Sequence, residues 1–396
     1  MISNNRSNEV LPMPDAAGLA HSDLVASHIR ALIGRSGGSI SFAEFMHEAL
    51  YAPGLGYYNA GAARFGPAGD FVTAPEIGPL FGRVLARQCA SILQRLPDCA
   101  VLELGAGSGR LAVEILRFLV ANGIDLQRYL ILEVSPALIM EQQRLIHAQV
   151  PELMQKVEWL DRLPQQFRGV VIGNEIADAL PVERFCMSGR DVLQMRVGCD
   201  EQAFAWRRAA APRFLAEAVT HIEATIGREL ASGFVSEVST GLARWAGDIA
   251  ACIETGFMFL FDYGLSRQEY YAPDRGDGWL RCHFRHRAHN DPLIYPGLQD
   301  LTAWVDFTSV AEAASGAGME IAGFVSQAQF LLNSGLSEEL EDFDRLPTAS
   351  QIELTRQVKI LTLPEEMGEN FKCMGLARGD MPVLSSFANL DRTHIL

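Results

Sequence analysis

A glycine-rich segment, ELGAGSG at residues 103–109, joins two stretches of opposite character. CAVLEL at residues 99–104 has the length and apolar content of a buried strand, and LAVEILRFLVANG at 111–123 carries apolar residues at helical spacing. Glycines at such a junction let the backbone turn tightly and approach a ligand, and the first turn of the following helix presents free N–H donors. The junction therefore predicts an α/β fold, with either a ligand-binding loop or a tight turn without a ligand.

Strands and helices continue to alternate after this junction. Short apolar runs at residues 128–134, 156–160 and 169–176 are typical of buried strands, and Pro136 favours the start of a helix between the first two. Strands that alternate with helices form a parallel sheet with helices on both faces. We therefore expect a doubly wound α/β core.

The remainder of the chain is expected to add to this core. Residues 22–97 have a mostly helical pattern, but they hold a glycine-rich stretch at 54–78, which we interpret as a functional surface loop. Residues 183–208 alternate as in an antiparallel meander, whereas residues 233–264 resume the strand–helix–strand order. A strand at 321–327 and a helical region should end the chain. The predicted organisation is a disordered tail (1–20), an N-terminal helical cap with a substrate and cofactor loop (21–98), the cofactor-binding core (99–182), an inserted strand-rich lobe (183–232) and the remainder of the core with C-terminal substrate-side additions (233–396).

Charge and composition exclude several classes of protein. The chain has 33 basic and 48 acidic side chains, and its net charge of −15 argues against a general nucleic-acid binder, because phosphate contacts need a basic face. No run of about 18 apolar residues occurs, so we expect no membrane span. The N-terminal residues lack the features of a signal or transit peptide, so a bacterial protein of this sequence is expected to be cytoplasmic. The seven cysteines form no C-x-x-C pair and are expected to be reduced.

Acidic side chains follow the second and third predicted strands. Glu133 ends the second, where a carboxylate can accept hydrogen bonds from both hydroxyls of a ribose, as in NAD or S-adenosylmethionine. The glycine segment departs from the dinucleotide motif G-x-G-x-x-G, because Arg110 stands at its last position and Gly109 comes one residue early. Asp161 follows the third strand, where it could bind an adenine amino group or cap a turn.

Further polar residues gather where the fourth strand ends. Asn174 and Glu175 end that strand, and Asp178 follows. Ligands of open α/β sheets bind beyond the carboxyl ends of the strands, so we expect the substrate here. Glu175 and Glu183 could together hold a guanidinium by paired charge-assisted hydrogen bonds, unless Glu183 lies on an exposed strand face.

A later apolar strand ends in Asp262 and Tyr263, and a histidine-rich segment follows it. His286, His289 and Asp291 lie in RHRAHNDPLIYPGLQD, where they could move a proton or hold a metal. Their spacing matches no recognised metal-ligand pattern, so we predict no metal site. A structural role and a substrate-binding role both stay open for His286.

Several segments in a fixed order resemble the MidA-like methyltransferases. They are GYY at 56–58, GDFVTAPEIGPLFG from residue 69, ELGAGSGRL, LILEVSP, GNEIADALPVERF, FDYG and PGLQDLTAWVDF, and they span about residues 39–330. ELGAGSG alone is common to methyltransferases, whereas GDFVTAPEI followed by GNEIADALPVERF is far more specific. The family includes the mitochondrial complex I assembly factor that symmetrically dimethylates an arginine of a complex I core subunit.

The resemblance implies a Rossmann-like class I methyltransferase core with S-adenosyl-L-methionine as cofactor. It places cofactor contacts on the glycine segment, on strand ends and on the loop at 73–76, namely at Glu103, Gly105, Gly107, Ser108, Gly109, Glu133, Asp161, Asn174, Thr73 and Glu76. It places substrate-side or catalytic roles at Glu175, Asp178, Glu183, Asp262, Tyr263 and His286. The family's usual DLTAHVDF has Trp304 in place of its histidine here, so no histidine role is carried over to that position.

The sequence thus predicts a methyltransferase that acts on an arginine of a protein, with a complex I core subunit as one candidate client. The nucleophile would attack the sulfonium methyl in line, while acidic neighbours localise the guanidinium charge and accept its proton. Three alternatives stay open: another methyl acceptor, an assembly chaperone whose cofactor site is not catalytic, and an NAD-dependent oxidoreductase. The missing glycine at position 110 argues against the oxidoreductase.

Overall fold

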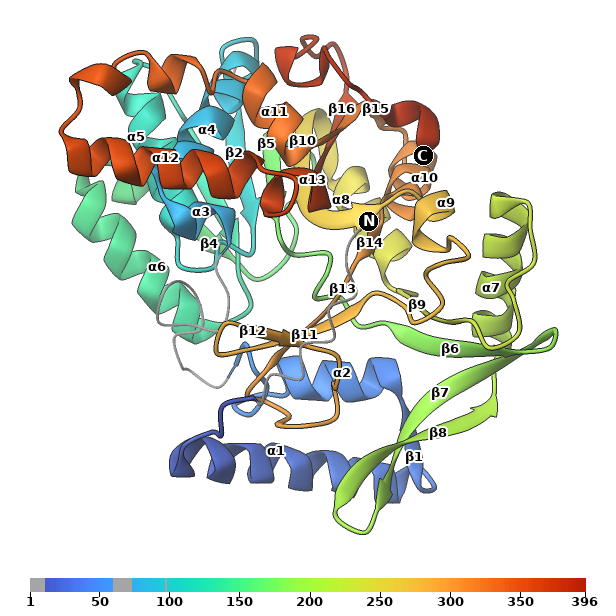
Figure 1. Ribbon diagram of the computed structural model, residues 1–396. Coiled ribbons are helices and arrows are strands. Elements are labelled where there is room, and N and C mark those ends of the chain that lie inside the picture. Colours follow the sequence, from blue (N-terminus) through green and yellow to red (C-terminus); the bar gives the residue numbers. More distant parts are fainter. Residues whose placement is uncertain (1–10, 60–72, 97) are drawn as a thin grey trace.

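The computed structural model describes residues 11–59, 73–96 and 98–396, and a mixed β-sheet forms its centre (Figure 1). The strands of this sheet are β2 (Ala100–Leu104), β3 (Arg128–Leu132), β4 (Val157–Leu160), β5 (Phe167–Asn174), β10 (Ile253–Leu265), β15 (Glu320–Ser326) and β16 (Phe371–Arg378). They lie in the order β15-β16-β10-β5-β2-β3-β4, and the short β14 (Val305–Asp306) pairs with β10. β16 is antiparallel to both neighbours, whereas β10, β5, β2, β3 and β4 are parallel.

Helices cover both faces of this sheet. Because side chains alternate along a strand, Val170 and Ile172 of β5 pack on one helical layer and Val171 packs on the other. The first layer contains α4 (Pro79–Leu93), α5 (Arg110–Ala121), α6 (Pro136–Gln149), α11 (Gln327–Asn333) and α12 (Thr348–Thr362), and the second contains α8 (Leu242–Cys252) and α10 (Phe307–Gly316). The predicted α/β core with a doubly wound sheet is confirmed.

A second sheet is antiparallel and lies beside the core (Figure 1). It contains β1 (Ser39–Ser41), β6 (Glu183–Ser188), β7 (Asp191–Asp200), β8 (Ala203–Ala210) and β9 (Val235–Val238), and the predicted meander at 183–208 is confirmed by the pairing of β6, β7 and β8. We expected residues 233–264 to return wholly to the core, and this is wrong for β9, which pairs with β6. The buried Glu237 of β9 explains the difference, because its Oε1 forms an ion pair with Nε of Arg184 in β6 at 3.2 Å.

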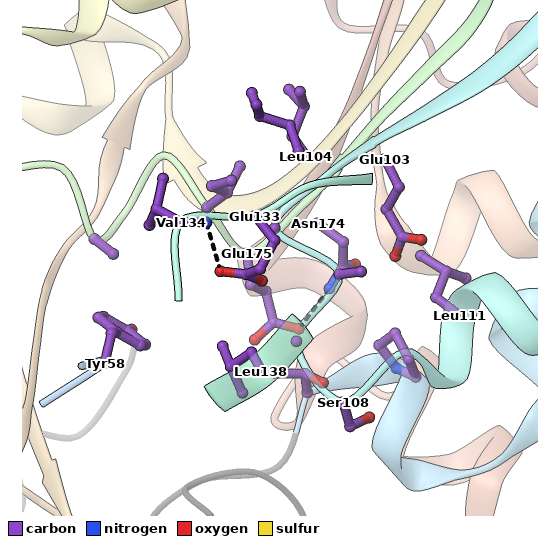
Figure 2. A pocket seen from close by; sticks show the side chains of 18 of the residues that line it. Tyr58, Glu103, Leu104, Ser108, Leu111, Glu133, Val134, Leu138, Asn174 and Glu175 are labelled. Atoms are coloured by element: carbon purple, nitrogen blue, oxygen red, sulfur yellow. Dashed lines mark hydrogen bonds between the residues drawn. The ribbon is translucent and has the colours of Figure 1, made fainter. Parts of the chain in front are cut away.

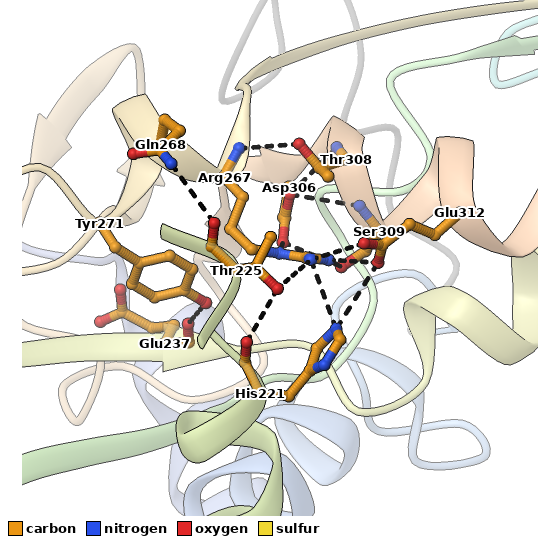
Figure 3. A network of polar contacts seen from close by, with 10 residues as sticks. All are labelled: His221, Thr225, Glu237, Arg267, Gln268, Tyr271, Asp306, Thr308, Ser309 and Glu312. Atoms are coloured by element: carbon orange, nitrogen blue, oxygen red, sulfur yellow. Dashed lines mark hydrogen bonds and ion pairs between the residues drawn. The ribbon is translucent and has the colours of Figure 1, made fainter. Parts of the chain in front are cut away.

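A buried arginine joins this lobe to the core (Figure 3). Arg267 opens the short helix α9 (Arg267–Tyr270) and is 3% exposed. Its guanidinium contacts Oδ2 of Asp306 at 3.0 Å, Oε2 of Glu312 in α10 at 2.7 Å and Oγ1 of Thr225 in α7 (Arg213–Ile226) at 3.4 Å. The two carboxylates compensate the buried charge, so the network fixes α7 against the second helical layer.

The N-terminal helices α1 (Ala16–Arg35) and α2 (Phe42–Tyr51) pack on a third sheet, in which the strands lie in the order β12 (Arg287–His289), β11 (Leu280–Phe284) and β13 (Asp300–Ala303). The helix α1 begins inside the predicted tail 1–20, because Asp15 caps it by accepting the backbone N–H of Gly18 at 2.8 Å. Residues 1–10 of that tail lie outside the described residues.

The C-terminal region was predicted as helical, and it also contributes β16 to the middle of the central sheet. The remaining helices are α3 (Ala74–Ile77), α13 (Met367–Asn370) and 3₁₀ turns at Pro151–Lys156, Glu338–Leu340, Phe343–Arg345, Ser385–Phe387 and Thr393–Ile395. Within the described residues, none of the helices combines the length and the apolar character that a membrane crossing requires.

Candidate active site

A cavity of about 370 Å³ lies at the carboxyl ends of β2, β3 and β5 (Figure 2). The core side of its wall is formed by residues 103–108, 132–134 and 174–176, together with Leu138 of α6. The other walls come from the N-terminal helices, from the start of α3 and from α8: Tyr51, Tyr58, Thr73, Pro75, Glu76, Trp245 and Ile249. This is the edge of an open α/β sheet at which ligands bind.

The glycine segment forms the turn from β2 into α5. Gly105, Gly107 and Gly109 have φ values of +62°, +53° and +86°, in the left-handed region that favours glycine. A Cβ added to Gly105 would lie 2.9 Å from Cδ1 of Ile176, and one added to Gly109 would lie 3.3 Å from Cα of Gln142. Gly105, Gly107 and Ser108 line the cavity, whereas Gly109 is the N-cap of α5 and packs on α6.

Glu133 projects into the cavity from the end of β3, and its carboxylate is held by three donors. Oε1 accepts the backbone N–H of Val134 at 2.9 Å and of Ser135 at 3.0 Å, and Oε2 accepts Nε2 of Gln142 at 3.0 Å. Burial raises the pKa of Glu133, and these hydrogen bonds oppose the rise.

Gln142 is a positioning residue that the sequence analysis missed. Its side chain is fully buried, donates to the carbonyl of Gly107 at 2.9 Å and accepts Nε1–H of Trp159 at 2.8 Å. One glutamine thus connects the glycine turn to Glu133. A single amide within a helix has no periodicity or motif of its own, so the sequence offered no signal for it.

Two more predicted residues lie beside the glycine turn, and one of them, Glu76, bonds to it directly. Glu103 lines the cavity, its Oε2 accepts the hydroxyl of Tyr129 at 2.6 Å, and burial raises its pKa to about 7. Glu76 of α3 accepts the hydroxyl of Ser108 and forms an ion pair with Nε of Arg110 at 3.0 Å. Thr73 is the N-cap of α3 and lines the same cavity, so the loop at 73–76 lies against the turn as expected.

Asp161 does not reach the cavity in this structure. Its side chain is 96% exposed, because β4 ends at Leu160 and the chain bends outward there. Leu163, two residues later, lines the cavity instead. In this structure Asp161 neither lines the cavity, as an adenine-binding role would require, nor accepts a capping hydrogen bond from the described residues; its one charged contact among them is with Arg162 at 4.0 Å.

Glu175 stands at the end of β5 in an uncommon backbone conformation. Its φ of +52° is rare for a residue with a side chain, and such residues cluster at functional sites. Its Oε1 accepts the backbone N–H of Ala74 at 3.1 Å and Nδ2 of Asn174 at 3.2 Å. Burial, reinforced by the charge of Asp178, raises the pKa of Glu175 to about 8.

Asp262 holds the turn that follows Glu175. Its Oδ2 accepts the backbone N–H groups of residues 176–178 at 2.9 to 3.2 Å, and its Oδ1 accepts the N–H of Tyr263 at 2.9 Å. Burial and the charges of Asp178 and Glu175 raise the pKa of Asp262. It is not among the residues that line the cavity, so its geometry is that of a positioning residue.

Asp178 and Tyr263 form a hydrogen-bonded pair behind Glu175. Their side chains interact directly, and burial raises the pKa of Asp178 to about 6. The ring of Tyr263 packs edge-on against Trp304 and Phe371. Neither Asp178 nor Tyr263 lines the cavity. Asp178 affects the site through its charge, which raises the pKa of Glu175.

Glu183 lies apart from Glu175. It is 5% exposed, accepts Nε2 of Gln194 at 2.9 Å and lines a separate groove, because Pro181 separates the cavity wall from the start of β6. Neither of the two interpretations of Glu183 fits this structure: it does not line the cavity of Glu175, and it does not lie on an exposed strand face.

His286, which was predicted as a possible substrate-binding residue, does not line the cavity either. It is exposed at the turn between β11 and β12, with φ of +60°. The hairpin turn accounts for this position. Among the described residues, no group of three or more histidine, cysteine, aspartate or glutamate side chains could hold a metal ion.

Two tyrosines of the N-terminal region complete the wall opposite Glu133. Tyr51 donates to the carbonyl of Ala179 at 2.9 Å, Tyr58 donates to Oδ1 of Asp300 at 2.9 Å, and their rings are stacked at 5.5 Å. GYY at 56–58 was the available signal for Tyr58, since it belongs to the segments that carry the family resemblance.

The cavity suits a nucleoside with a charged amino-acid substituent. The carboxylate of Glu133 can accept ribose hydroxyls, and the apolar side chains of Leu132, Leu163, Leu180 and Trp245 offer a surface for a base. The glycine turn lets the backbone come close to the remaining part of such a ligand. The buried Oδ1 of Asn174, which has no hydrogen-bond partner among the described residues, is a further acceptor for it.

Comparisons with known proteins agree with this site. A family model for S-adenosyl-L-methionine-dependent methyltransferases matches residues 84–325. The chain is 31% identical to the mitochondrial protein arginine methyltransferase NDUFAF7 homolog of Drosophila melanogaster, over 92% of this chain and 88% of the relative. It is also 31% identical to the NDUFAF7 protein of Mus musculus, over 90% and 86%.

A solved structure covers the entire fold. A crystal structure of a Burkholderia thailandensis protein bound to S-adenosyl-homocysteine is similar with a TM-score of 0.91 and 39% identity, over 98% of this chain and 100% of that chain. S-adenosyl-L-methionine is accordingly the cofactor of this chain, and the glycine turn and Glu133, predicted to contact it, line the cavity. The chain belongs to the family of S-adenosyl-L-methionine-dependent methyltransferases.

Proposed function

We propose that this methyltransferase acts on the guanidinium group of an arginine in a protein substrate. The observation that carries the proposal is Glu175, a partly buried carboxyl with a raised pKa that lines the same cavity as the cofactor residues. Burial disfavours the ionised form of such a carboxyl. A cationic ligand that binds beside it compensates the negative charge, so the site favours a cationic ligand. The relatives named protein arginine methyltransferases support the same acceptor.

The residues of the chain suit the steps of such a transfer. S-adenosyl-L-methionine supplies the electrophilic methyl group when it is bound. Glu175 would lose its proton as the guanidinium binds and would orient one nitrogen toward the cofactor side of the cavity. The same carboxylate, ionised beside the guanidinium, can accept the proton that this nitrogen releases after methylation. Tyr51 and Tyr58 would exclude water from the wall opposite Glu133.

A finer proposal follows from the family resemblance. The MidA-like family includes the mitochondrial complex I assembly factor, so we propose a complex I core subunit as client and a symmetrically dimethylated arginine as product. The segments that carry the resemblance include GNEIADALPVERF, which contains Glu175.

The test is methyl transfer from labelled S-adenosyl-L-methionine to arginine-containing peptides and to a complex I core subunit, with the product read by mass spectrometry. Glu175→Gln should lower transfer at least a hundredfold and leave cofactor binding by calorimetry within a factor of about three, since its amide keeps the shape but loses the charge. Glu341→Gln, at an exposed glutamate, is the matched control and should behave as the wild type. Full transfer by Glu175→Gln would contradict the assigned role, and labelling of another side chain would overturn the proposed acceptor.

A further inference from the structure

A second hollow lies beside the cavity, and we call it the α2 groove. Its volume is about 850 Å³. It is lined by one face of α2, by residues 181 and 183, by β7, by the end of β8 and by the start of α7; its charged and aromatic members are Glu44, His47, Glu48, Glu183, Arg196 and Phe214. None of these residues lines the cavity.

The α2 groove and the cavity share two walls. Residues 44, 47, 48 and 51 follow the i, i+3, i+4, i+7 spacing and lie on one face of α2, where the first three line the groove and Tyr51 lines the cavity. On the opposite side, residues 179 and 180 line the cavity and residues 181 and 183 line the groove. The hydroxyl of Tyr51 bonds to the carbonyl of Ala179 at 2.9 Å, so the boundary between the two hollows lies there.

The α2 groove is acidic. Glu44 accepts the backbone N–H of Ser41 at 2.8 Å, and Glu48 contacts Nε2 of His28 at 2.7 Å, and each uses only Oε2 in that contact. Their Oε1 atoms are left for a ligand, because the described residues show no further bond to either carboxylate.

The positive charge of Arg196 on the groove wall lies beside Glu183, whose carboxylate partly offsets it. The guanidinium of Arg196 donates to the carbonyl of Ser39 at 2.7 Å, to its hydroxyl at 3.0 Å and to Oε1 of Gln194 at 2.9 Å. At the rim, Phe214 is an aromatic side chain that is 49% exposed. The carboxylates of Glu44 and Glu48 and the exposed ring form a surface that is complementary to a basic, partly apolar peptide segment.

We propose that the α2 groove holds a basic segment of the protein substrate, adjacent to the arginine that receives the methyl group. This inference rests on the proposed function, since it assumes an arginine acceptor. A chain seated in the groove reaches the cavity at Tyr51, at the end of α2. Lysine or arginine side chains flanking the target would then pair with Glu44 and Glu48, so the groove would select arginines in basic sequence contexts.

The test uses two peptides that share one target arginine, flanked by lysines in one and by serines in the other. With saturating S-adenosyl-L-methionine and low salt, the wild type should show a lower KM for the lysine peptide. Glu44→Gln/Glu48→Gln should raise that KM about fivefold, with kcat and the KM for the serine peptide unchanged. Glutamine at position 44 preserves the capping box of α2, so the fold should be retained, as thermal unfolding will show. Added salt should remove the difference between the peptides.

Reversal of the charge at position 48 gives a second test of the docking inference. Glu48→Lys should invert the preference in favour of a peptide flanked by glutamates, whereas Glu341→Gln should leave all three peptides unaffected. If the wild type methylates both original peptides with equal KM, or if the double variant keeps the lysine preference, the docking inference is wrong. If neither peptide is methylated, the proposed function fails instead, and fluorescence anisotropy of the labelled peptides still decides whether the groove binds the basic one.

Discussion

Replacement of Glu175 by glutamine should stabilise the protein by an amount that grows with pH. Burial raises the pKa of this carboxyl from 4.5 to about 8. The unfolded chain therefore releases the proton near pH 4.5, and the folded protein keeps it to about pH 8. Ionisation consequently opposes folding as the pH rises through this window. Well below pH 4.5, the carboxyl is protonated in the folded and in the unfolded protein, so the substitution no longer changes stability through this charge.

The magnitude follows from the same two pKa values. Each tenfold change in an acidity constant corresponds to about 1.4 kcal/mol, so the full effect above pH 8 is roughly 4 to 5 kcal/mol. Because Glu175 is only partly buried and faces a cavity that admits water, we expect about half of this, or ~2 kcal/mol. The glutamine variant removes the ionisation and keeps an oxygen for the backbone N–H of Ala74.

Urea unfolding at about pH 5, 7 and 9 measures this directly. The free energy of unfolding of Glu175→Gln minus that of the wild type should be ~0.4 kcal/mol at pH 5 and rise to about 2 kcal/mol in favour of the variant at pH 9. Glu341→Gln should show no such trend, because that side chain is exposed. A difference that is constant across the three pH values would refute the reasoning, since Glu175 would then have an ordinary pKa.

Three further predictions concern the cofactor and positioning residues. Glu133→Ala should weaken S-adenosyl-L-methionine binding about 10- to 100-fold by calorimetry, because charge-assisted hydrogen bonds to the ribose are lost, and tight NAD binding by the wild type would contradict this reading. Gln142→Leu should weaken the same binding about tenfold although Gln142 does not line the cavity; unchanged affinity would show that Glu133 needs no support from α6. Asp262→Asn should reduce stability by about 2 kcal/mol, because it weakens the hydrogen bonds to the backbone N–H groups of residues 176–178, and an unchanged free energy of unfolding in urea would show that this turn does not depend on Asp262.

The cofactor half of the site could be predicted from the sequence because its signals are local. The glycine turn and Glu133 lie within about thirty residues, and the strand–helix rhythm places them at one edge of the sheet. Asp161 departs from the prediction for an equally local reason, since one bend after β4 turns its side chain to solvent. Periodicity locates the end of a strand within a few residues but does not fix the direction of the next side chain.

The substrate half depends on contacts between distant parts of the chain, which a single sequence does not display. The backbone N–H of Ala74 reaches Glu175 across 101 positions, and Tyr58 reaches Asp300 across 242. Glu183 looked like a partner of Glu175 because it follows closely in sequence, yet Pro181 separates the cavity wall from β6. The strand β16 was not predicted for the same reason, because it pairs on both sides with strands from earlier in the chain, β10 and β15.

This division of the site has a functional consequence. The glycine turn and Glu133 belong to consecutive units of the doubly wound core, so changes on the groove-lining face of α2 should leave cofactor binding largely intact. The part of the wall that we assign to the methyl acceptor is formed by α2, by the segment before β6 and by the end of β5, and Asp262 holds the turn that follows β5. Substitutions on α2 should therefore alter which protein is methylated without altering the donor. The Glu44→Gln/Glu48→Gln variant separates these two functions most sharply, since both substitutions remove charge from the α2 groove and neither residue lines the cavity.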